Sequence, residues 1–560
     1  MNERKATKRT VAVLGGGMTG LSAAFYLYRE AERRGVPLAV TVLEASSRLG
    51  GRVNTLRRDG FVIERGPESF LARKLPMIEL AEALGMTGEF TGTNPAAKVT
   101  YIAHDNVLHG MPAGLNLGVP TNAEAFLATG LLSEEGKRRA LAEVDVPPAV
   151  IEEPDSQDES VGDFLERRFG AEMVTRIFEP LLAGIYAGDL YGLGLAATFP
   201  QFRELERQYG SVIRGLAEQS RAARERAVQG QTVQVRSVQG RGGQESPAQG
   251  AAQEKPTPRR EDREPSGEAA GSEPTAGGRA TPSSEASASR SIGSLFLTFS
   301  SGLQSVIEAL EARLREEGCE IRLGMRVTAL RKMEAGSASA SASASGPSGT
   351  YRLAMDDGSW LDADAVVVAL PAAGIADLLE PHADVSAMRN TRYVSVANVV
   401  FGYDEDGFDH PLDGSGFLVP RGEGRLITAS TWTSSKWLHT APAGKRLIRC
   451  YVGRAGEETN VELSDEAMTA GVRRDLQELM GLTAVPSFVE ITRHRRAMPQ
   501  YPPGHRTAVE AFLAELAGRL PGVMPAGQPF GGVGLPDCVE QGRQAAESVV
   551  RTLGARYNRE

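Results

Sequence analysis

Three glycines near the start of the chain have the spacing of a turn that binds phosphate. Gly15, Gly17 and Gly20 fill the pattern G-x-G-x-x-G between an apolar segment, 10–14, and residues 21–34, which have helical spacing. A strand, a glycine turn and a helix in this order place phosphates at the positive end of the helix. We expect Gly15 to make the tight turn, Gly17 to let the backbone approach a pyrophosphate, and Gly20 to allow close helix packing.

An acidic residue ends the next apolar segment. Glu44 closes the segment 38–44 and lies 24 residues after Gly20. At about this separation an acidic side chain binds a ribose hydroxyl in dinucleotide folds. The glycine turn and Glu44 together predict a dinucleotide site, but they leave NAD and FAD open because both cofactors share the same ADP half.

The elements that must position these residues belong to a long chain of mildly acidic composition. Its 560 residues, 41% of them hydrophobic, are enough for two or three domains. A net charge of −9 argues against nucleic-acid binding, which needs a concentrated cationic surface. Cys319, Cys450 and Cys538 lack CxxC spacing, so they indicate a reducing compartment and predict neither disulfides nor a metal site.

Neither a signal peptide nor a transmembrane segment is expected. The basic start is followed by a short apolar strand broken by glycines, and no apolar run reaches the length of about 18 residues that a spanning helix needs. We therefore expect a cytoplasmic protein with at most peripheral membrane contact.

Two segments have the composition of flexible chain. Residues 223–290 are rich in Gln, Gly, Ser, Pro, Glu and Arg and almost lack large apolar side chains, so we expect a disordered insertion. Residues 335–349 alternate Ser and Ala between two strand-like stretches, "GMRVTALRK" and "YRLAMDDGSWLDADAVVVAL", and predict a flexible low-complexity loop.

The residues after Glu44 resemble a signature of the flavin-containing amine oxidase superfamily. The pattern E-x-x-x-R-x-G-G-R runs from Glu44 to Arg52, and G-P-E-S follows at 66–69. The resemblance implies that Gly50, Gly51 and Arg52 lie along the pyrophosphate and ribityl chain, and that 66–69 approaches the flavin. Physically, the two glycines allow close backbone approach and Arg52 supplies a fixed cation for phosphate oxygens.

Four further stretches resemble protoporphyrinogen oxidases, and specifically the soluble bacterial branch that acts on coproporphyrinogen III. They are "PLLAGIYAGD" at 180–189, "RCYVGRAGEE" at 449–458, "AMPQYPPGH" at 497–505 and "GGVGLPDCVEQGRQAA" at 531–546. The resemblance covers 10–554 apart from the two low-complexity segments. It implies one non-covalently bound FAD per chain and an oxygen-dependent reaction.

The fold that the resemblance implies is of the mixed α/β class. A Rossmann-like FAD-binding domain of the flavin amine oxidase type would be joined to a sheet-based substrate domain and a helical subdomain. We expect the FAD-binding domain to be discontinuous, with residues 10–85, 292–371 and 500–557. The substrate-binding domain is expected at 86–110 and 372–499, and the helical subdomain at 111–222.

The expected cofactor-binding residues combine the glycine turn with positions implied by the resemblance. Val327 is implied as a backbone contact to adenine, and the helix that begins after the turn at 531–534 could direct its positive end at the pyrimidine edge of the flavin. The full set is Gly15, Gly16, Gly17, Met18, Thr19, Gly20, Glu44, Ala45, Arg52, Gly66, Pro67, Glu68, Ser69, Val327, Val533, Gly534 and Leu535.

The substrate-binding residues follow from the same resemblance. Lys74, or alternatively Arg73, is expected to pair with a propionate. Ile185 and Tyr451 are expected to line an apolar cavity, where Tyr451 offers its hydroxyl group to a carboxylate. His494 stands where the family often has tryptophan, so a flavin contact at this position stays open.

The implied reaction removes six electrons from a macrocycle in three two-electron steps. Flavin accepts the hydride equivalents and oxygen regenerates it, with release of hydrogen peroxide. No acid or base is compulsory, so we assign no catalytic residue and no metal ligand. We interpret His104, His109 and His505 as structural.

Alternatives remain open at this point. They are protoporphyrinogen IX as the substrate, another flavin enzyme such as an amine oxidase or carotenoid desaturase, and a non-catalytic flavoprotein that binds tetrapyrrole. The expected partners are coproporphyrinogen III and molecular oxygen, with a transient contact to a ferrochelatase.

Overall fold

The computed structural model describes residues 8–149, 158–228, 294–333 and 350–557. Apart from the end of helix α10 (Val212–Val228), these residues belong to one compact unit. Helix α10 continues through 223–228, which we expected to be disordered, because the strong helix formers Ala, Arg and Glu extend to its end. The rest of the expected insertion and the loop at 335–349 lie outside the described residues.

A five-stranded parallel sheet carries the glycine turn. Its strand order is β12-β2-β1-β16-β22. Val11 of β1 lies between Val40 and Ala365, and β16 is buried along its whole length, as expected for a parallel strand covered on both faces. The strands are β1 (Arg9–Leu14), β2 (Leu38–Glu44), β12 (Glu320–Leu323), β16 (Ala365–Val368) and β22 (Val523–Pro525).

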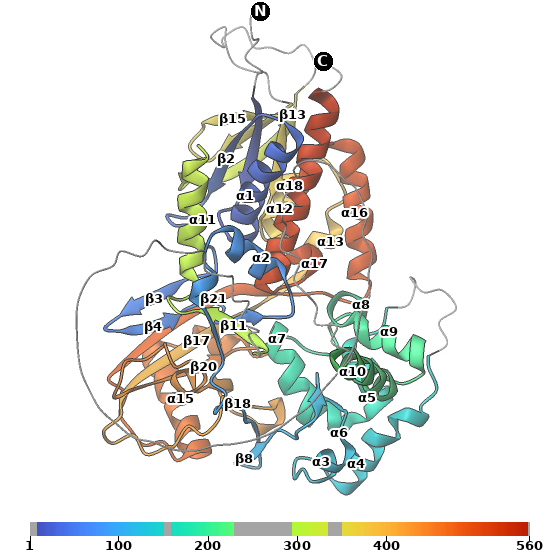
Figure 1. Cartoon of the computed structure of the whole chain (residues 1–560), viewed down its shortest axis with the longest axis vertical. Helices are drawn as coiled ribbons and strands as arrows, with labels where there is room; N and C mark the ends of the chain where they lie inside the picture. Colours follow the sequence, from blue (N-terminus) through green and yellow to red (C-terminus); the bar gives the residue numbers. More distant parts are fainter. Residues whose placement is uncertain (1–7, 150–157, 229–293, 334–349, 558–560) are drawn as a thin grey trace, which may run out of the picture. The chain divides into compact units, whose positions relative to one another are not determined.

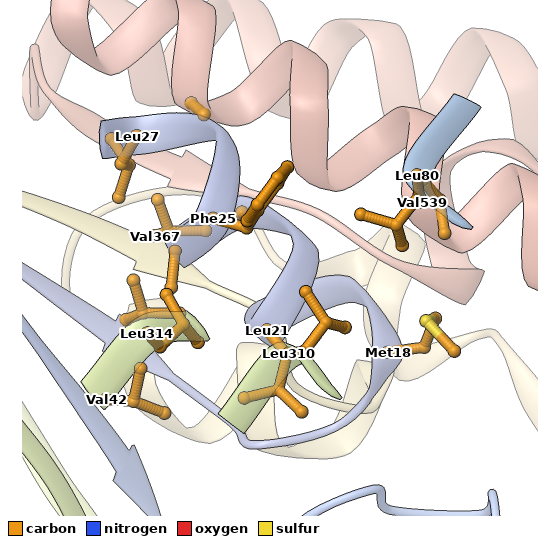
Figure 2. Close-up of a cluster of buried hydrophobic side chains, with 14 of the residues drawn as sticks. Met18, Leu21, Phe25, Leu27, Val42, Leu80, Leu310, Leu314, Val367 and Val539 are labelled. Carbon is orange, nitrogen blue, oxygen red and sulfur yellow. The ribbon is translucent and has the colours of Figure 1, made fainter. Parts of the chain in front are cut away.

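Apolar side chains join the helices to this sheet. Figure 2 shows Leu21 and Phe25 of the first helix near Leu310 and Leu314, with Val42 and Val367 from the strands, all within one buried cluster. The helices in this cluster are α1 (Met18–Arg34), α2 (Pro76–Ala83), α11 (Gln304–Glu316) and α18 (Leu535–Tyr557).

Helices α1 and α18 run side by side and parallel (Figure 1). A Cβ on Gly542 would lie 2.6 Å from the Thr19 carbonyl oxygen, so glycine allows close contact near the start of both helices. At the other end, a Cβ on Gly554 would contact Val36, which follows α1. The N-termini of the two helices therefore lie next to each other.

A small antiparallel sheet follows β12 in the chain. It contains β13 (Val327–Lys332), β14 (Tyr351–Met355) and β15 (Trp360–Ala363). The stretch 351–370, which we expected to be one strand, forms β14, β15 and β16. A turn at 356–358 with Gly358 at φ +83° separates β14 from β15, and a bend at Asp364 separates β15 from β16, which joins the five-stranded sheet. The helices packed nearby are α12 (Ala372–Leu379), α13 (Ser386–Arg389), α16 (His505–Arg519) and α17 (Gln528–Gly531).

A seven-stranded sheet has the order β21-β17-β20-β19-β18-β7-β8. One face packs against α15 (Asp465–Met480), where Ile448 and Cys450 share a core with Met468. On the other face, Val400 and Leu447 meet Phe61 and Ile63 of the hairpin β3 (Thr55–Arg58) and β4 (Phe61–Glu64). The strands are β7 (Thr100–His104), β8 (Val107–Gly110), β17 (Arg392–Asp404), β18 (Gly416–Leu418), β19 (Ile427–Thr431), β20 (Lys445–Val452) and β21 (Phe488–Gln500).

Several helices between 123 and 228 pack around a separate core. At its edge, Arg168 is fully buried and forms ion pairs with Glu143 and Glu206, while Glu143 also accepts a hydrogen bond from the Val212 N–H at the start of α10. The helices are α3 (Ala123–Leu127), α4 (Glu134–Leu141), α5 (Val161–Phe169), α6 (Ala171–Met173), a π-helical turn (Val174–Ala183), α7 (Gly184–Tyr186), α8 (Leu195–Thr198), α9 (Pro200–Tyr209) and α10.

Short elements connect these parts. They are β5 (Phe70–Leu71), β6 (Phe90–Gly92) and β11 (Phe296–Phe299) in one sheet, β9 (Leu115–Asn116) and β10 (Val119–Pro120) in another, and α14 (Thr433–Lys436). In the described part of the chain, no helix has both the length and the apolar composition that a bilayer-spanning segment requires.

Candidate functional site

Steric contacts require glycine at Gly15, in the turn between β1 and α1, and at Gly20, in the first turn of α1. Gly15 has φ +104°, and its Cβ would lie 2.4 Å from the Ala369 carbonyl oxygen. A Cβ on Gly20 would lie 1.9 Å from the Gly15 carbonyl oxygen. Gly15 therefore permits the tight turn, and Gly20 permits the close packing of the helix against that turn.

Gly17 has a different environment. It is the N-cap of α1 at φ −80°, a conformation open to any residue, and a Cβ there would approach only the Cα of Gly51, at 4.0 Å. The two glycine segments face each other, since Gly17 pairs with Gly50 and the Gly50 N–H donates to Gly16 O at 2.8 Å. No described side chain caps α1, so the positive helix end and two stretches without Cβ atoms form a cradle suited to a diphosphate.

Glu44 holds the turn and the start of β13 together. Its Oε2 accepts a hydrogen bond from the Gly16 N–H at 2.6 Å, and its Oε1 accepts one from Ser46 at 2.8 Å. The Met325 N–H donates to the Glu44 carbonyl at 2.9 Å, which brings Val327 into the same neighbourhood. Each carboxylate oxygen retains a lone pair that could accept a hydrogen bond from a sugar hydroxyl.

Arg52 is a partly buried cation near the start of α18. Burial lowers the pKa of its guanidinium, while Tyr393 and Cys538 nearby act in the opposite direction. Its Nη2 donates to the Arg496 carbonyl at 3.3 Å, and no carboxylate among the described residues forms an ion pair with it. An anionic group of a bound cofactor would supply the missing negative charge.

Three side chains of the seven-stranded sheet hold two successive carbonyl groups of the segment that leads from β4 into 66–69. We call Asn398, Arg449 and His494 the carbonyl clamp. Asn398 Nδ2 and His494 Nε2 donate to Arg65 O at 2.9 and 2.6 Å, and Arg449 Nη2 donates to Gly66 O at 2.5 Å. A Cβ on Gly66 would lie 1.8 Å from Arg52 O, so the backbone that the clamp holds packs directly against the backbone of Arg52.

His494 therefore binds the backbone from the position where we left a flavin contact open. Because a carbonyl oxygen only accepts, the proton lies on Nε2. Burial lowers the pKa of this imidazole, and Arg52 lowers it further, which favours the neutral form. The sequence feature that could have indicated the clamp is a polar residue within an otherwise apolar strand, as Asn398 is within "VSVANVVF".

The side chain of Glu68 pairs with Lys436 of α14, with 3.0 Å between Oε2 and Nζ. Burial raises the pKa of this carboxyl group, but Lys436 and Arg449 lower it by more, so it lies below its usual range. Glu68 was expected to bind cofactor, and in the structure its carboxylate is directed to these cations. Pro67 and Ser69 flank it in the chain and are partly buried.

Lys74 makes a two-point ion pair with Asp537, with Nζ at 2.6 and 2.8 Å from the carboxylate oxygens. Asp537 lies in the first turn of α18 and also accepts a hydrogen bond from the Gly534 N–H at 3.3 Å. The expected substrate cation is thus tied to the segment Val533–Leu535, which we expected at the flavin. Arg73, the alternative, is exposed.

Ile185 and Tyr451 come from segments that the structure joins. The Ala455 N–H donates to Ala187 O at 2.8 Å and links α7 to the loop after β20. Ile185 is 43% exposed, and Tyr451 lies with its ring centre 4.9 Å from the guanidinium carbon of Arg449. Ile185 is therefore available to a ligand, and Tyr451 lies on the same strand face as the clamp.

The three histidines that we interpreted as structural differ in their partners. His505 is buried and its Nε2 lies 2.8 Å from the Pro529 carbonyl oxygen. His104 lies 3.1 Å from Glu423, and its ring centre lies 6.0 Å from that of His109. None of these contacts involves the residues of the glycine cradle.

Comparisons with known proteins agree with this geometry. The family described as flavin containing amine oxidoreductase matches residues 18–550. Coproporphyrinogen III oxidase of Bacillus subtilis (strain 168) is 35% identical over 98% of this chain and 99% of its own length, and the Staphylococcus aureus protein of the same name is 32% identical over 97% and 100%. A crystal structure of a "Putative protoporphyrinogen oxidase" from Exiguobacterium sp. 255-15 superimposes with a TM-score of 0.74 at 31% identity, covering 97% of this chain and 99% of that chain.

Proposed function

The chain belongs to the flavin-containing amine oxidoreductase family, and from this premise we propose that it is an FAD-dependent oxidase of coproporphyrinogen III. The proposed reaction converts coproporphyrinogen III and three O₂ to coproporphyrin III and three H₂O₂, a six-electron dehydrogenation in heme biosynthesis. Full-length similarity to relatives named coproporphyrinogen III oxidase supports this choice of substrate.

One structural observation supports FAD most strongly. The cradle between Gly17 and Gly51 lies at the uncapped end of α1, beside the start of the parallel helix α18, and Arg52 adds a cation without a carboxylate partner among the described residues. A flavin dinucleotide needs an anion site, for which the cradle and Arg52 are suited, and we propose that its ring lies beside 66–69 and the start of α18. We propose that one FAD binds here without a covalent bond.

Each part of the site has its own task in this proposal. The first-turn N–H groups of α1 bind the diphosphate, Glu44 accepts from a ribose hydroxyl, and Val327 lies against adenine. Arg52 neutralises negative charge, and the clamp fixes the peptide at Gly66. The bound flavin supplies the two-electron acceptor for each dehydrogenation. The contacts are the seventeen cofactor positions expected from the sequence.

The substrate contacts are proposed at Lys74, Ile185 and Tyr451. A tetrapyrrole with propionates offers an apolar disc and several carboxylates. Ile185 would contact the disc, and Lys74 and the Tyr451 hydroxyl would meet carboxylates. Because Lys74 already pairs with Asp537, the incoming carboxylate must share or displace that partner.

The proposal also includes the domain division described above, a cytoplasmic location, oxygen as the acceptor, and a transient contact with a ferrochelatase. Protoporphyrinogen IX is the alternative substrate. It carries two propionates fewer than coproporphyrinogen III, so it would need fewer cations.

The test begins with protein purified from cells supplied with riboflavin. We expect a yellow protein that releases FAD on denaturation, and initial rates, read from porphyrin fluorescence and peroxide, that are higher with coproporphyrinogen III than with protoporphyrinogen IX. Faster protoporphyrinogen oxidation would reverse the substrate choice. A yellow protein inert toward both would favour a non-catalytic tetrapyrrole-binding flavoprotein, and a colourless protein that takes up no FAD would end the proposal.

A further inference from the structure

A small cavity lies between hairpin strand β4 and strands β17 and β20 of the seven-stranded sheet. Its volume open to water-sized molecules is about 10 Å³, which is the lower limit for one water molecule. Glu68, which belongs to the proposed flavin segment 66–69, and Arg449, which binds the Gly66 carbonyl, contribute to its wall. The lining residues whose polar groups matter here are Glu68, Trp437, His439 and Arg449.

These four side chains carry polar atoms that have no hydrogen-bond partner among the described residues. They are Glu68 Oε1, Trp437 Nε1, His439 Nδ1, and Nε and Nη1 of Arg449. The atoms themselves are buried, and of the side chains Arg449 is only 4% exposed and Trp437 is fully buried. Buried polar groups in folded proteins are almost always satisfied by protein or by ordered water.

Glu68 and Trp437 show why a bridging molecule is needed. The Trp437 indole N–H is directed at the Glu68 carboxylate and helps to lower its pKa, but the contact does not have hydrogen-bond geometry, so Nε1 and Oε1 are each left without a full partner. Both are fixed on their other sides, because Glu68 pairs with Lys436 and Trp437 is buried in the protein. A water molecule in the cavity that both residues line could complete the hydrogen bonds of these two atoms.

We propose that this cavity binds a single water molecule that accepts hydrogen bonds from Trp437 and Arg449 and donates one to Glu68. A water molecule combines donors and acceptors, as the wall does, and typically makes two to four hydrogen bonds when buried. An anion fits less well, because the positive charges of Lys436 and Arg449 already face the carboxylate of Glu68 and its unpaired oxygen.

The water gives Arg449 a positioning role. One guanidinium nitrogen, Nη2, holds the Gly66 carbonyl, while the water would accept a hydrogen bond from one further N–H of the group and so help to fix its plane. Gly66 in turn contacts the backbone of Arg52. This role rests on the proposed function, since it matters for the flavin only if 66–69 lies beside it; the water site itself does not depend on turnover.

The test uses two tryptophan variants of the FAD-loaded protein. Trp437→Phe removes one N–H donor of the cavity. Trp432→Phe is the matched control, because Trp432 is also buried with an unpartnered Nε1 but does not line this cavity. Crystal structures should show an ordered water between Glu68 and Arg449 in the wild type and in Trp432→Phe, and a weak or absent one in Trp437→Phe.

The positioning role has a separate readout. Trp437→Phe should raise the dissociation constant for FAD by about three- to tenfold and shift the visible absorption bands of the flavin, whereas Trp432→Phe should do neither. A dry cavity in the wild type, or an anion revealed by anomalous scattering of bromide, overturns the water site. Equal FAD affinity and equal spectra in the two variants overturn the positioning role. A protein that oxidises no porphyrinogen can still show the ordered water, the FAD affinity and the flavin spectrum. Failure of the proposed function is therefore distinguishable from failure of the water site or of the positioning role.

Discussion

Replacing Gly17 by alanine should separate flavin binding from folding. The backbone there, at φ −80°, accepts any residue, and outside its own turn of chain the new Cβ would meet no atom of the described residues nearer than Gly51 Cα at 4.0 Å. Alanine is a poorer N-cap than glycine, so we expect the free energy of unfolding of the flavin-free protein to fall by about 1 kcal/mol or less.

The same methyl group would stand in the cradle where the diphosphate has to approach the start of α1. Loss of two charge-assisted N–H contacts, at about 1.5–3 kcal/mol each, predicts an increase of about 100-fold or more in the dissociation constant for FAD. Quenching of FAD fluorescence on titration measures the affinity, and urea unfolding of the flavin-free protein measures the stability.

Gly20→Ala is the matched control at the same turn. Its Cβ would lie 1.9 Å from Gly15 O, so the backbone must move, and we expect a loss of stability of about 1–3 kcal/mol even without flavin. A Gly17→Ala protein that binds FAD as tightly as the wild type would refute the placement of the diphosphate. A Gly17→Ala protein destabilised as much as Gly20→Ala would refute the steric reasoning.

Four further substitutions test other parts of the structure. Lys74→Met should raise KM for coproporphyrinogen III about fivefold, whereas Asp537→Asn should lower KM because the amide competes less for Lys74. Initial rates measure both. A raised KM in Asp537→Asn would count against the idea that the substrate carboxylate displaces Asp537 from Lys74. Arg168→Met should cost about 3–5 kcal/mol in urea unfolding because Glu143 stays buried without its cation, and a loss below about 1 kcal/mol would contradict this. Burial raises the pKa of Glu64 from 4.5 to about 7, so the folded state holds its proton to higher pH than the unfolded chain. Relative to Glu64→Gln, the wild type should therefore lose about 3 kcal/mol of stability as the pH rises from about 4.5 through about 7, and parallel stability profiles of the two proteins would rule this out.

The strand, turn and helix at the start of the chain were predictable because steric constraints decide which residue types fit there. Gly15 and Gly20 are surrounded by backbone atoms that leave no room for a Cβ, and an apolar β-branched run before them marks a buried strand. Family membership, predicted from the motif between Glu44 and Arg52, is confirmed by the match over residues 18–550, and the mixed α/β fold class is confirmed as well.

The contacts between distant segments could not be predicted in the same way. Asn398, Arg449 and His494 form one clamp only because β17 pairs with both β20 and β21, which is a property of strand register. Lys74 reaches an acid 463 residues further along the chain, and nothing in its neighbourhood identifies that acid. The identity of a partner depends on tertiary packing, whereas the pattern of one segment indicates only that a charge is present.

The central claim is that a flavin bound in the glycine cradle takes electrons from a porphyrinogen. Mixing the FAD-loaded protein with coproporphyrinogen III in the absence of oxygen tests it most directly. We predict that the visible absorbance of the flavin bleaches as it takes up the first two electrons, and that porphyrin fluorescence rises once oxygen is admitted and reoxidises the flavin for the two further steps. Gly17→Ala protein, given the same FAD, should show no bleaching. Flavin that stays oxidised beside coproporphyrinogen III would contradict the account.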